Sequence, residues 1–446
     1  MKLTYDIHDR PKFGPNLVFA FQQLLAIIAA TLLVPTLVNL LNSSGIVMDQ
    51  AAALFGAGAG TLCYLLITRR KSPVFLGSSF AFINSLAGAC VFGFCGIIVG
   101  SLIAGLVYVI IAVIIRFTGS VWVNKLLPPV IIGPTVALIG LSLCGSAVNN
   151  LNNTSAGDYN LFAILVGLVT FLVTVIASVK GNRTMKLIPF IIGIAAGYVL
   201  ASIFTLIGNA AGVDAMKLID YAALANMDSI IHVPQFTIIQ AFKEGFGNQI
   251  DGTSIVSLIA LFAPVAFVTL AEHIGDHKNL SSIIDRDLIT DPGLDKTIAG
   301  DGIGSIVGAV FGGCPNTTYG ECVGCVAITG NASIFTIGTT AVLALILSFF
   351  NPFVQFVNTI PVCVVGGICI ALYGFIAVSG LKMIQTVDLG ENKNLFVVAS
   401  VLVPGIGGLT LNFGAITITE IATALIIGII TNALVHIGDK KKEAQG

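Results

Sequence analysis

The sequence predicts an all-α polytopic membrane protein with about fourteen transmembrane segments. Hydrophobic residues make up 56% of its 446 residues and charged residues only 10%, and the mean hydropathy is +0.98. A soluble domain carries about 25% charged residues. Many of the apolar runs approach the roughly 20 residues with which an α-helix crosses a bilayer. The net charge of −1 argues against a nucleic-acid partner.

The candidate spans follow from the apolar runs in chain order. They cover approximately residues 15–41, 47–68, 74–90, 92–117, 129–149, 159–179, 186–208, 254–277, 296–313, 316–331, 333–351, 356–378, 394–411 and 415–437. The third and the tenth are unusual because both are short and polar at one end. An odd number of spans in each half of the chain would invert the second half relative to the first. Matched irregular spans in two such repeats point to a transporter binding site at the repeat interface.

The positions of Lys and Arg predict the orientation. If the N-terminus is cytoplasmic, all but Lys217 and Lys243 of the 21 Lys and Arg fall in cytoplasmic segments. The positive-inside rule predicts such a bias. We therefore expect both termini to be cytoplasmic and the chain to lie in the plasma membrane. The long outer segment 209–252 contains "VDAMKLIDYAAL", whose spacing fits either an interfacial helix or a partly ordered surface loop.

Four acidic residues lie inside predicted spans, where ionisable side chains are costly and usually functional. Glu272 and Asp276, in "TLAEHIGDHKN", are four residues apart and share a helix face. The alternative for each is a charge at the membrane edge. For Asp301, in "AGDGIG", helix capping or packing is the favoured interpretation. Glu321 has no basic residue near it in sequence and follows "PNTTYG".

The segment "PNTTYG" predicts part of a pocket. Pro315 and Gly320 flank a stretch that can be extended, and a half-helix after it would present free N–H groups and a positive dipole end. The segment "GSSFAF" in the third span allows the same arrangement. Two half-helix ends and two carboxylates would suit a small flat ligand with N–H donors and carbonyl acceptors. Phe80 or Tyr319 could stack on such a ligand.

Other function classes fit less well. Two glutamates would repel the substrate of an anion carrier, and the third, eighth and tenth spans supply no basic residue. An intramembrane aspartyl protease would need a GxGD pattern, which "IAGD" lacks. Cys322 and Cys325 form a lone CxxC, whereas a zinc site would need two more ligands. No GxxxxGK[ST] phosphate-binding pattern occurs. We therefore expect no enzyme activity, no metal and no cofactor.

Several motifs spread along the chain resemble those of the nucleobase–ascorbate transporter family, and within it the bacterial uracil permeases. They are "LLVPTL", "LGSSFAFI", "LLPPVIIGPTVALIGL", "AEHIGDH", "DLITDPGL", "GGCPNTTYGE" and "LYGFIAVSGLK". The resemblance implies two inverted repeats of seven spans, with short antiparallel strands in spans three and ten. It also implies proton-coupled uptake of a nucleobase as a core domain moves against a gate domain, and an expected homodimer through the gate.

The resemblance also implies domain boundaries. The core domain would comprise 1–117 and 253–351, the gate domain 118–210 and 352–437, with an outer loop at 211–252 and a cytoplasmic tail at 438–446.

The roles of individual residues follow from the same resemblance. The family's glutamates in spans eight and ten fall on Glu272 and Glu321, and its aromatic contact in span three falls on Phe80. The coupling proton would bind Glu272, Glu321 or Asp276. The expected substrate-binding residues are Glu272, Glu321, Phe80, Gly320, Tyr319 and Ala81.

The chain departs from the uracil-permease pattern at three positions. A histidine one turn after the first glutamate is here Asp276, a histidine in span one is Gln23, and an asparagine after the second glutamate is Cys322. Family members that carry oxidised purines often have glutamine where this chain has Glu321, which favours uracil over xanthine or urate. A xanthine- or urate-type purine symporter is the alternative, and the coupling ion, proton or sodium, stays open.

Overall fold

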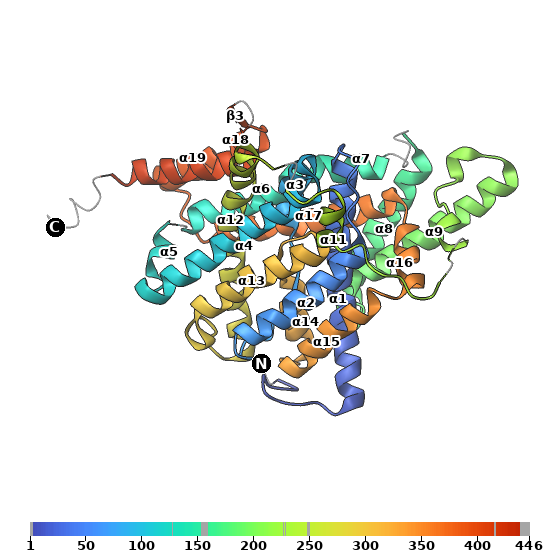
Figure 1. Cartoon of the computed structure of the whole chain (residues 1–446), viewed down its shortest axis with the longest axis horizontal. Coiled ribbons are helices and arrows are strands. Elements are labelled where there is room, and N and C mark those ends of the chain that lie inside the picture. The colour runs from blue at the N-terminus through green and yellow to red at the C-terminus, as the bar shows by residue number, and fades with distance from the viewer. Residues whose placement is uncertain are drawn as a thin grey trace.

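The computed structural model describes residues 3–126, 128–152, 159–225, 227, 229–247, 250–413 and 416–437, and the predicted tail 438–446 lies outside them. The described chain is largely helical (Figure 1). The helices are α1 (Phe13–Leu41), α2 (Gln50–Ile67), α3 (Ile83–Ala89), α4 (Gly93–Thr118), α5 (Val121–Leu126), α6 (Pro129–Ser142), α7 (Cys144–Asn152), α8 (Leu161–Lys180), α9 (Pro189–Ala211), α10 (Ala222–Ala225), α11 (Thr237–Lys243), α12 (Gly252–Ile284), α13 (Leu294–Gly312), α14 (Gly320–Thr329), α15 (Ile334–Leu347), α16 (Asn351–Asn358), α17 (Val362–Ile384), α18 (Asn392–Ile406) and α19 (Glu420–Val435). The strands are β1 (Leu76–Ser78), β2 (Asn316–Thr318), β3 (Leu411–Phe413) and β4 (Ile416–Ile418).

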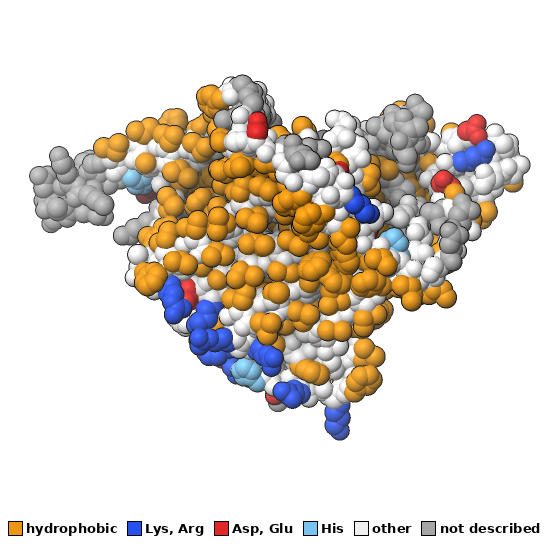
Figure 2. Space-filling model, in the orientation of Figure 1, with side chains coloured by type: hydrophobic (Ala, Val, Ile, Leu, Met, Phe, Trp, Pro, Cys, Tyr) orange, Lys and Arg blue, Asp and Glu red, His pale blue; other side chains and the backbone are white. Residues whose placement is uncertain are grey.

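The helices have the length and composition of membrane spans. Within the described residues, 8 helical stretches are long and apolar enough to cross a membrane, and α14, α15, α18 and α19 are shorter apolar helices. The predicted all-α membrane class is therefore confirmed, while the number of fourteen spans stays a prediction. Figure 2 shows apolar side chains over most of one face, with Lys and Arg gathered at its lower edge.

One end of the molecule carries a cluster of basic side chains, which we call the basic end. It is defined by Lys71 and Arg286, which line one small cavity, and by Arg116. Lys71 pairs with Asp291 at 2.7 Å, and Arg116 with Asp295 at 3.5 Å.

The helices pack as two groups. In the first group α1–α4 pack with α12–α15, and in the second α6–α9 pack with α17–α19 (Figure 1). Small residues allow the closest approaches, as is common between membrane helices. A Cβ atom on Gly56 of α2 would lie 2.5 Å from the carbonyl oxygen of Gly308 in α13. In the second group, a Cβ on Gly380 of α17 would lie 2.5 Å from the carbonyl oxygen of Gly133 in α6.

Strands β1 and β2 join the two halves of the chain inside the first group. They pair antiparallel, with Leu76 opposite Thr318 and Ser78 opposite Asn316. All their residues are buried. The predicted antiparallel strands of the third and tenth spans are thus confirmed. Irregular backbone is tolerated at membrane depth only where protein or a cavity satisfies it, which is why each strand is short and enclosed by helices.

The segment 209–252 does not form a continuous interfacial helix. The stretch "VDAMKLIDYAAL" contains one 3₁₀ turn, Asp214–Met216, and the short α10. Between them the chain has no regular secondary structure, and the Thr205 hydroxyl accepts the N–H groups of Leu218 and Ile219, each at 3.1 Å. The buried Ile219 side chain packs with apolar residues of α8 and α9. The surface-loop alternative therefore describes this segment better.

Candidate functional site

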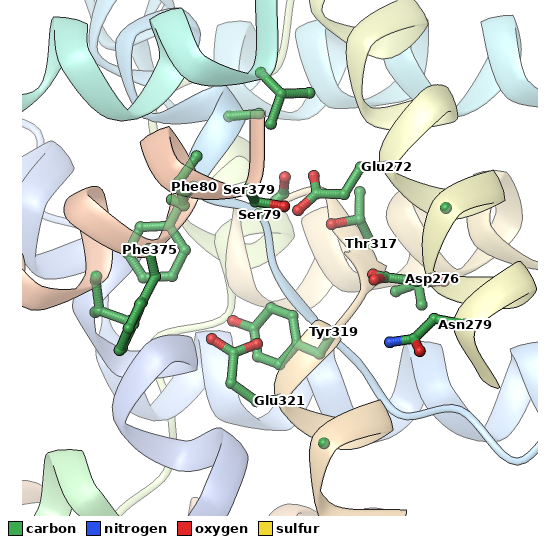
Figure 3. A pocket seen from close by; sticks show the side chains of 18 of the residues that line it. Ser79, Phe80, Glu272, Asp276, Asn279, Thr317, Tyr319, Glu321, Phe375 and Ser379 are labelled. Atoms are coloured by element: carbon green, nitrogen blue, oxygen red, sulfur yellow. The ribbon is translucent and has the colours of Figure 1, made fainter. Parts of the chain in front are cut away.

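A cavity of about 650 Å³ lies beside the strand pair and is lined by residues of both helix groups (Figure 3). Every residue predicted for the site lines it. These residues are Phe80, Ala81, Glu272, Asp276, Tyr319, Gly320 and Glu321. Figure 3 shows the Glu272 and Glu321 carboxylates directed toward one central space, with Phe80 and Phe375 on one side of it. Lys186 and Lys382 also line the cavity.

Helix α12 supplies the first acidic side chains. Glu272 and Asp276 lie one turn apart on its cavity face, and Asn279 continues the same face. The helix runs on to Ile284, so Glu272 does not sit at a helix end. The Glu272 side chain is exposed to the cavity rather than enclosed by protein. It is thus available to a ligand that enters the cavity.

The N-terminus of α14 forms the opposite wall. The first N–H groups of a helix have no intrahelical acceptor, and in α14 they begin at Gly320, which lines the cavity. Asp276 approaches this helix end, since a Cβ atom on Gly320 would lie 3.7 Å from Asp276 Oδ1. Glu321 occupies the first turn of α14. Tyr319 donates its hydroxyl to the Ser78 carbonyl at 2.8 Å, which fixes its ring across β1.

Behind the cavity, a buried polar group holds β2 in place. Asp301 of α13 accepts the hydroxyl of Thr318 at 3.1 Å and the Thr318 N–H at 3.4 Å. Nδ1 of His273 lies 2.8 Å from Asp301 Oδ2, the oxygen that also accepts the Thr318 N–H. His273 and Asp301 are almost fully buried. Asp301 therefore does not cap a helix; it packs against β2, which is the second of the two roles expected for it.

His277 extends this polar group toward α2, and the sequence interpretation missed it. Its Nδ1 lies 2.9 Å from the His273 carbonyl, an acceptor, so Nδ1 carries the hydrogen. Nε2 then accepts a hydroxyl, from Tyr64 at 2.7 Å or from Ser72 at 3.2 Å. The two imidazole rings stack with centroids 4.0 Å apart. The motif "AEHIGDH" does contain a signal for this buried polar group. Its two acids are four residues apart on one helix face, and its two histidines are four residues apart on the neighbouring face.

Comparisons with known proteins place this cavity in a family context. Residues 14–414 match the model of the Permease family, that of xanthine and uracil permeases. The chain belongs to this family, the nucleobase–ascorbate transporters. It is therefore a multi-pass membrane permease and not an enzyme, as the sequence predicts.

Curated relatives of this nucleobase–ascorbate transporter match along nearly their whole length. This chain is 38% identical over 437 residues to the uracil permease of Bacillus caldolyticus, and the match covers 97% of this chain and 95% of the relative. It is 36% identical over 442 residues to the uracil permease of Bacillus subtilis (strain 168), with the same coverage of 97% and 95%. It is 31% identical to the uracil permease of Escherichia coli (strain K12), covering 95% and 92%.

Solved structures support the fold of the transporter. The transmembrane domain of the cyanobacterial bicarbonate transporter BicA aligns with a TM-score of 0.59 at 14% identity, covering 95% of this chain and 98% of that one. Murine Slc26a9, an anion transporter in the inward-facing state, aligns with a TM-score of 0.64 at 11% identity, covering 97% and 70%. At these identities the likeness concerns the fold alone.

The three departures from the uracil-permease pattern occupy different places in this family member. Asp276 lines the cavity. Cys322 is buried on another face of α14, where its Sγ accepts the Phe75 N–H at 3.2 Å. Gln23 is buried in α1 and is not among the lining residues. Asp276 is thus the departure with direct access to a ligand.

The second helix group contributes residues that the sequence interpretation missed. Phe375 and Ser379 of α17 line the cavity beside Phe80 (Figure 3). The Phe80 ring also makes an edge-on contact with Tyr373, with centroids 6.5 Å apart. Nothing in the apolar stretch "LYGFIAVSGLK" marks these positions as ligand-facing, because their place depends on how α17 packs against the first group.

Replacing Gly77 by alanine should weaken ligand binding at least about tenfold. A Cβ atom there would lie 2.3 Å from the Tyr319 ring, so the ring and the start of α14 would have to shift. Binding of labelled uracil to the purified protein measures the effect. Gly374→Ala in α17 is the matched control, since nothing lies within 4 Å of its added methyl group. Equal affinity in both variants would show that Tyr319 does not shape the site.

Proposed function

We propose that this permease takes up uracil together with protons across the plasma membrane. The observation that carries the proposal is the pair of carboxylates, Glu272 and Glu321, on one cavity that also meets the N-terminus of α14. The near full-length relatives that are named uracil permeases support the substrate.

Uracil matches the chemistry of this cavity. It is neutral at physiological pH and has two N–H groups and two carbonyl oxygens. Glu272 and Glu321 would accept the N–H groups, while the backbone N–H groups of Phe80 and Gly320 would donate to the carbonyls. Hydrogen bonds to an ionised partner are stronger than neutral ones. An analogue that lacks one N–H would leave a carboxylate unpaired, at a cost of about 1–3 kcal/mol or more.

The proposed transport cycle uses the two helix groups. The first group would be the core domain (1–117 and 253–351), and the second the gate domain (118–210 and 352–437). The basic end would face the cytoplasm, following the positive-inside rule. Lys186 and Lys382 line the cavity, and the positive-inside rule assigns both to the cytoplasmic side, so the cavity would open toward the cytoplasm. The homodimer through the gate domain stays a prediction.

Coupling to protons would follow from the cost of moving charge. An ionised carboxylate is expensive to carry through an apolar interface. A proton on Glu272, Glu321 or Asp276 would lower that cost, so the loaded core would cross more easily than the empty one. The driving force would then come from the proton gradient without ATP.

A purine symporter of the xanthine or urate type is the second candidate. The observation that favours it is Asp276, which replaces the histidine of the uracil-permease pattern and lines the cavity. A larger bicyclic base would also use more of the cavity. Glu321 in place of glutamine favours uracil over this alternative.

Uptake of labelled uracil into proteoliposomes tests the proposal. Uptake should depend on an imposed proton gradient, and unlabelled uracil should block it while xanthine and urate do not. Thymine, which carries one more methyl group than uracil, serves as a further competitor. Its effect on uptake measures how closely the cavity wall at Phe80 fits the pyrimidine ring. Transport of xanthine instead of uracil would contradict the substrate and point to Asp276. Uracil uptake that ignores the gradient would contradict the coupling.

A further inference from the structure

The C-terminal end of α14 is held from both helix groups. The last carbonyl groups of a helix have no intrahelical donor. Thr4, in the N-terminal segment, donates its hydroxyl to the Thr329 carbonyl at 3.2 Å and its N–H to the Gly330 carbonyl at 2.7 Å. The Ile328 carbonyl accepts Nε–H of Arg183 at 2.8 Å and a second N–H from the same guanidinium. Arg183 lies in the turn between α8 and α9, so it reaches α14 from the second group.

Arginine is well suited to this position. Its guanidinium is always charged and presents several N–H donors in one plane. A cation next to the C-terminus of a helix also interacts favourably with the helix dipole. Across the described part of the chain, Arg183 makes no ion pair with a carboxylate. Its polar contact is therefore directed at α14.

An apolar contact between the two groups lies beside this hydrogen bond. Leu187, four residues after Arg183, packs in one small buried cluster with Ala26 of α1 and Cys325 of α14. Ile188 and Ile328 pack against the same cluster. The turn that carries Arg183 is thus seated on α14 by side-chain packing as well as by the guanidinium.

We propose that Arg183 is a latch between the gate domain and the half-helix that carries the binding site. This inference rests on the proposed function, in which the core moves against the gate. One end of α14 presents Gly320 and Glu321 to the cavity, and the other end is bonded to Arg183. Because α14 is short and continuous, the position of one end fixes the position of the other. Arg183 is a positioning residue: it stabilises the arrangement seen here and does not contact the substrate.

Cross-linking across the contact tests the latch. In a Leu187→Cys chain, the new thiol lies in the same cluster as the native Cys325. Mild oxidation should link them, as detected by mass spectrometry of the joined peptides, and Cys325→Ser should abolish the product. Because Leu187 and Cys325 also line the cavity, uracil binding is measured beside transport: the cross-linked chain should lose transport while it still binds uracil, and reductant should restore transport. Adding Arg183→Gln should slow cross-link formation about tenfold, because hydrogen bonds from a charged donor are lost, while Arg183→Lys should slow it less.

Two controls separate the latch from a general effect on folding. Lys180→Gln, a nearby basic residue at the end of α8, should leave the cross-linking rate unchanged. Arg183→Gln should weaken uracil binding much less than Glu321→Gln does, since Arg183 does not line the cavity. If Leu187→Cys does not fold, Ile188→Cys serves the same purpose. Equal cross-linking rates with and without Arg183, or full transport by the cross-linked chain, would overturn the proposal.

The outcome for the latch is distinguishable from the outcome for the proposed function. Cross-linking rates are measured without transport, so they judge Arg183 even if the unmodified chain carries no uracil. If the chain neither takes up nor binds uracil but its cross-linking rate still depends on Arg183, the proposed substrate is rejected and the latch is kept.

Discussion

Glu321→Gln should weaken uracil binding at least about tenfold and abolish uptake driven by a proton gradient. Glutamine keeps the size of the side chain and can still accept a hydrogen bond, but it has no charge and cannot bind a proton. A hydrogen bond to a charged group contributes about 1.5–3 kcal/mol, against about 0.5–1.5 kcal/mol for a neutral pair. The measurements are uracil affinity in detergent and gradient-driven accumulation in proteoliposomes.

Glu420→Gln is the matched control for this prediction. Glu420 begins α19 and accepts the Asn84 amide at 3.1 Å, but it does not line the cavity. Glu420→Gln should therefore leave uracil affinity and uracil accumulation nearly unchanged. Comparing Glu321→Gln with Glu272→Gln then separates two roles. The variant whose gradient-driven accumulation falls further than its uracil affinity marks the proton-binding carboxylate, and full accumulation in both variants would contradict the proposed coupling.

Asp301→Asn should abolish uracil binding and destabilise the protein, although Asp301 does not line the cavity. The Asp301 carboxylate accepts two groups of Thr318 and lies 2.8 Å from His273 Nδ1. An amide would turn an NH₂ group toward one of these donors. Removing one partner of a buried pair typically costs about 3–5 kcal/mol. Since Thr318 immediately precedes Tyr319 and α14, the wall of the site would move with it.

Thermal unfolding and uracil binding of the purified variant measure these effects. Asp295→Asn is the control in the same helix, because Asp295 makes a 3.5 Å pair with Arg116 at the basic end. Combining Asp301→Asn with His273→Asn should cost less than the two changes separately, as expected for residues in direct contact. Strictly additive effects, or normal binding by Asp301→Asn, would show that this pair does not support the site.

The features that local sequence determines could be predicted. Long apolar runs predict membrane helices, and Pro315, Gly320 and the polar residues between them predict a break before α14. The cavity-facing positions of Glu272 and Asp276 follow from their four-residue spacing on one helix. Helix periodicity places Glu272 and Asp276 on one face, and the cost of an ionisable group in a membrane span favours a cavity beside that face.

The features that depend on packing between distant segments could not be predicted. Nothing near Asp301 in sequence indicates that it bonds β2, because its partners Thr318 and His273 come from other elements. Phe375 reaches the cavity only because α17 packs against the first group. The irregular chain at Ile219 likewise depends on the Thr205 hydroxyl, which competes with the helix that the local spacing favours.

The pairing of β1 with β2 has a consequence for biosynthesis. Leu76 is opposite Thr318, so more than half of the chain separates the two partners. During translation β1 enters the membrane long before the ribosome has made β2. Until then its N–H and C=O groups lack their strand partner, in surroundings that offer little water. The proposed uracil site therefore cannot form before α14 has been made, and a nascent chain that stops before α14 contains most of the helices but no complete site.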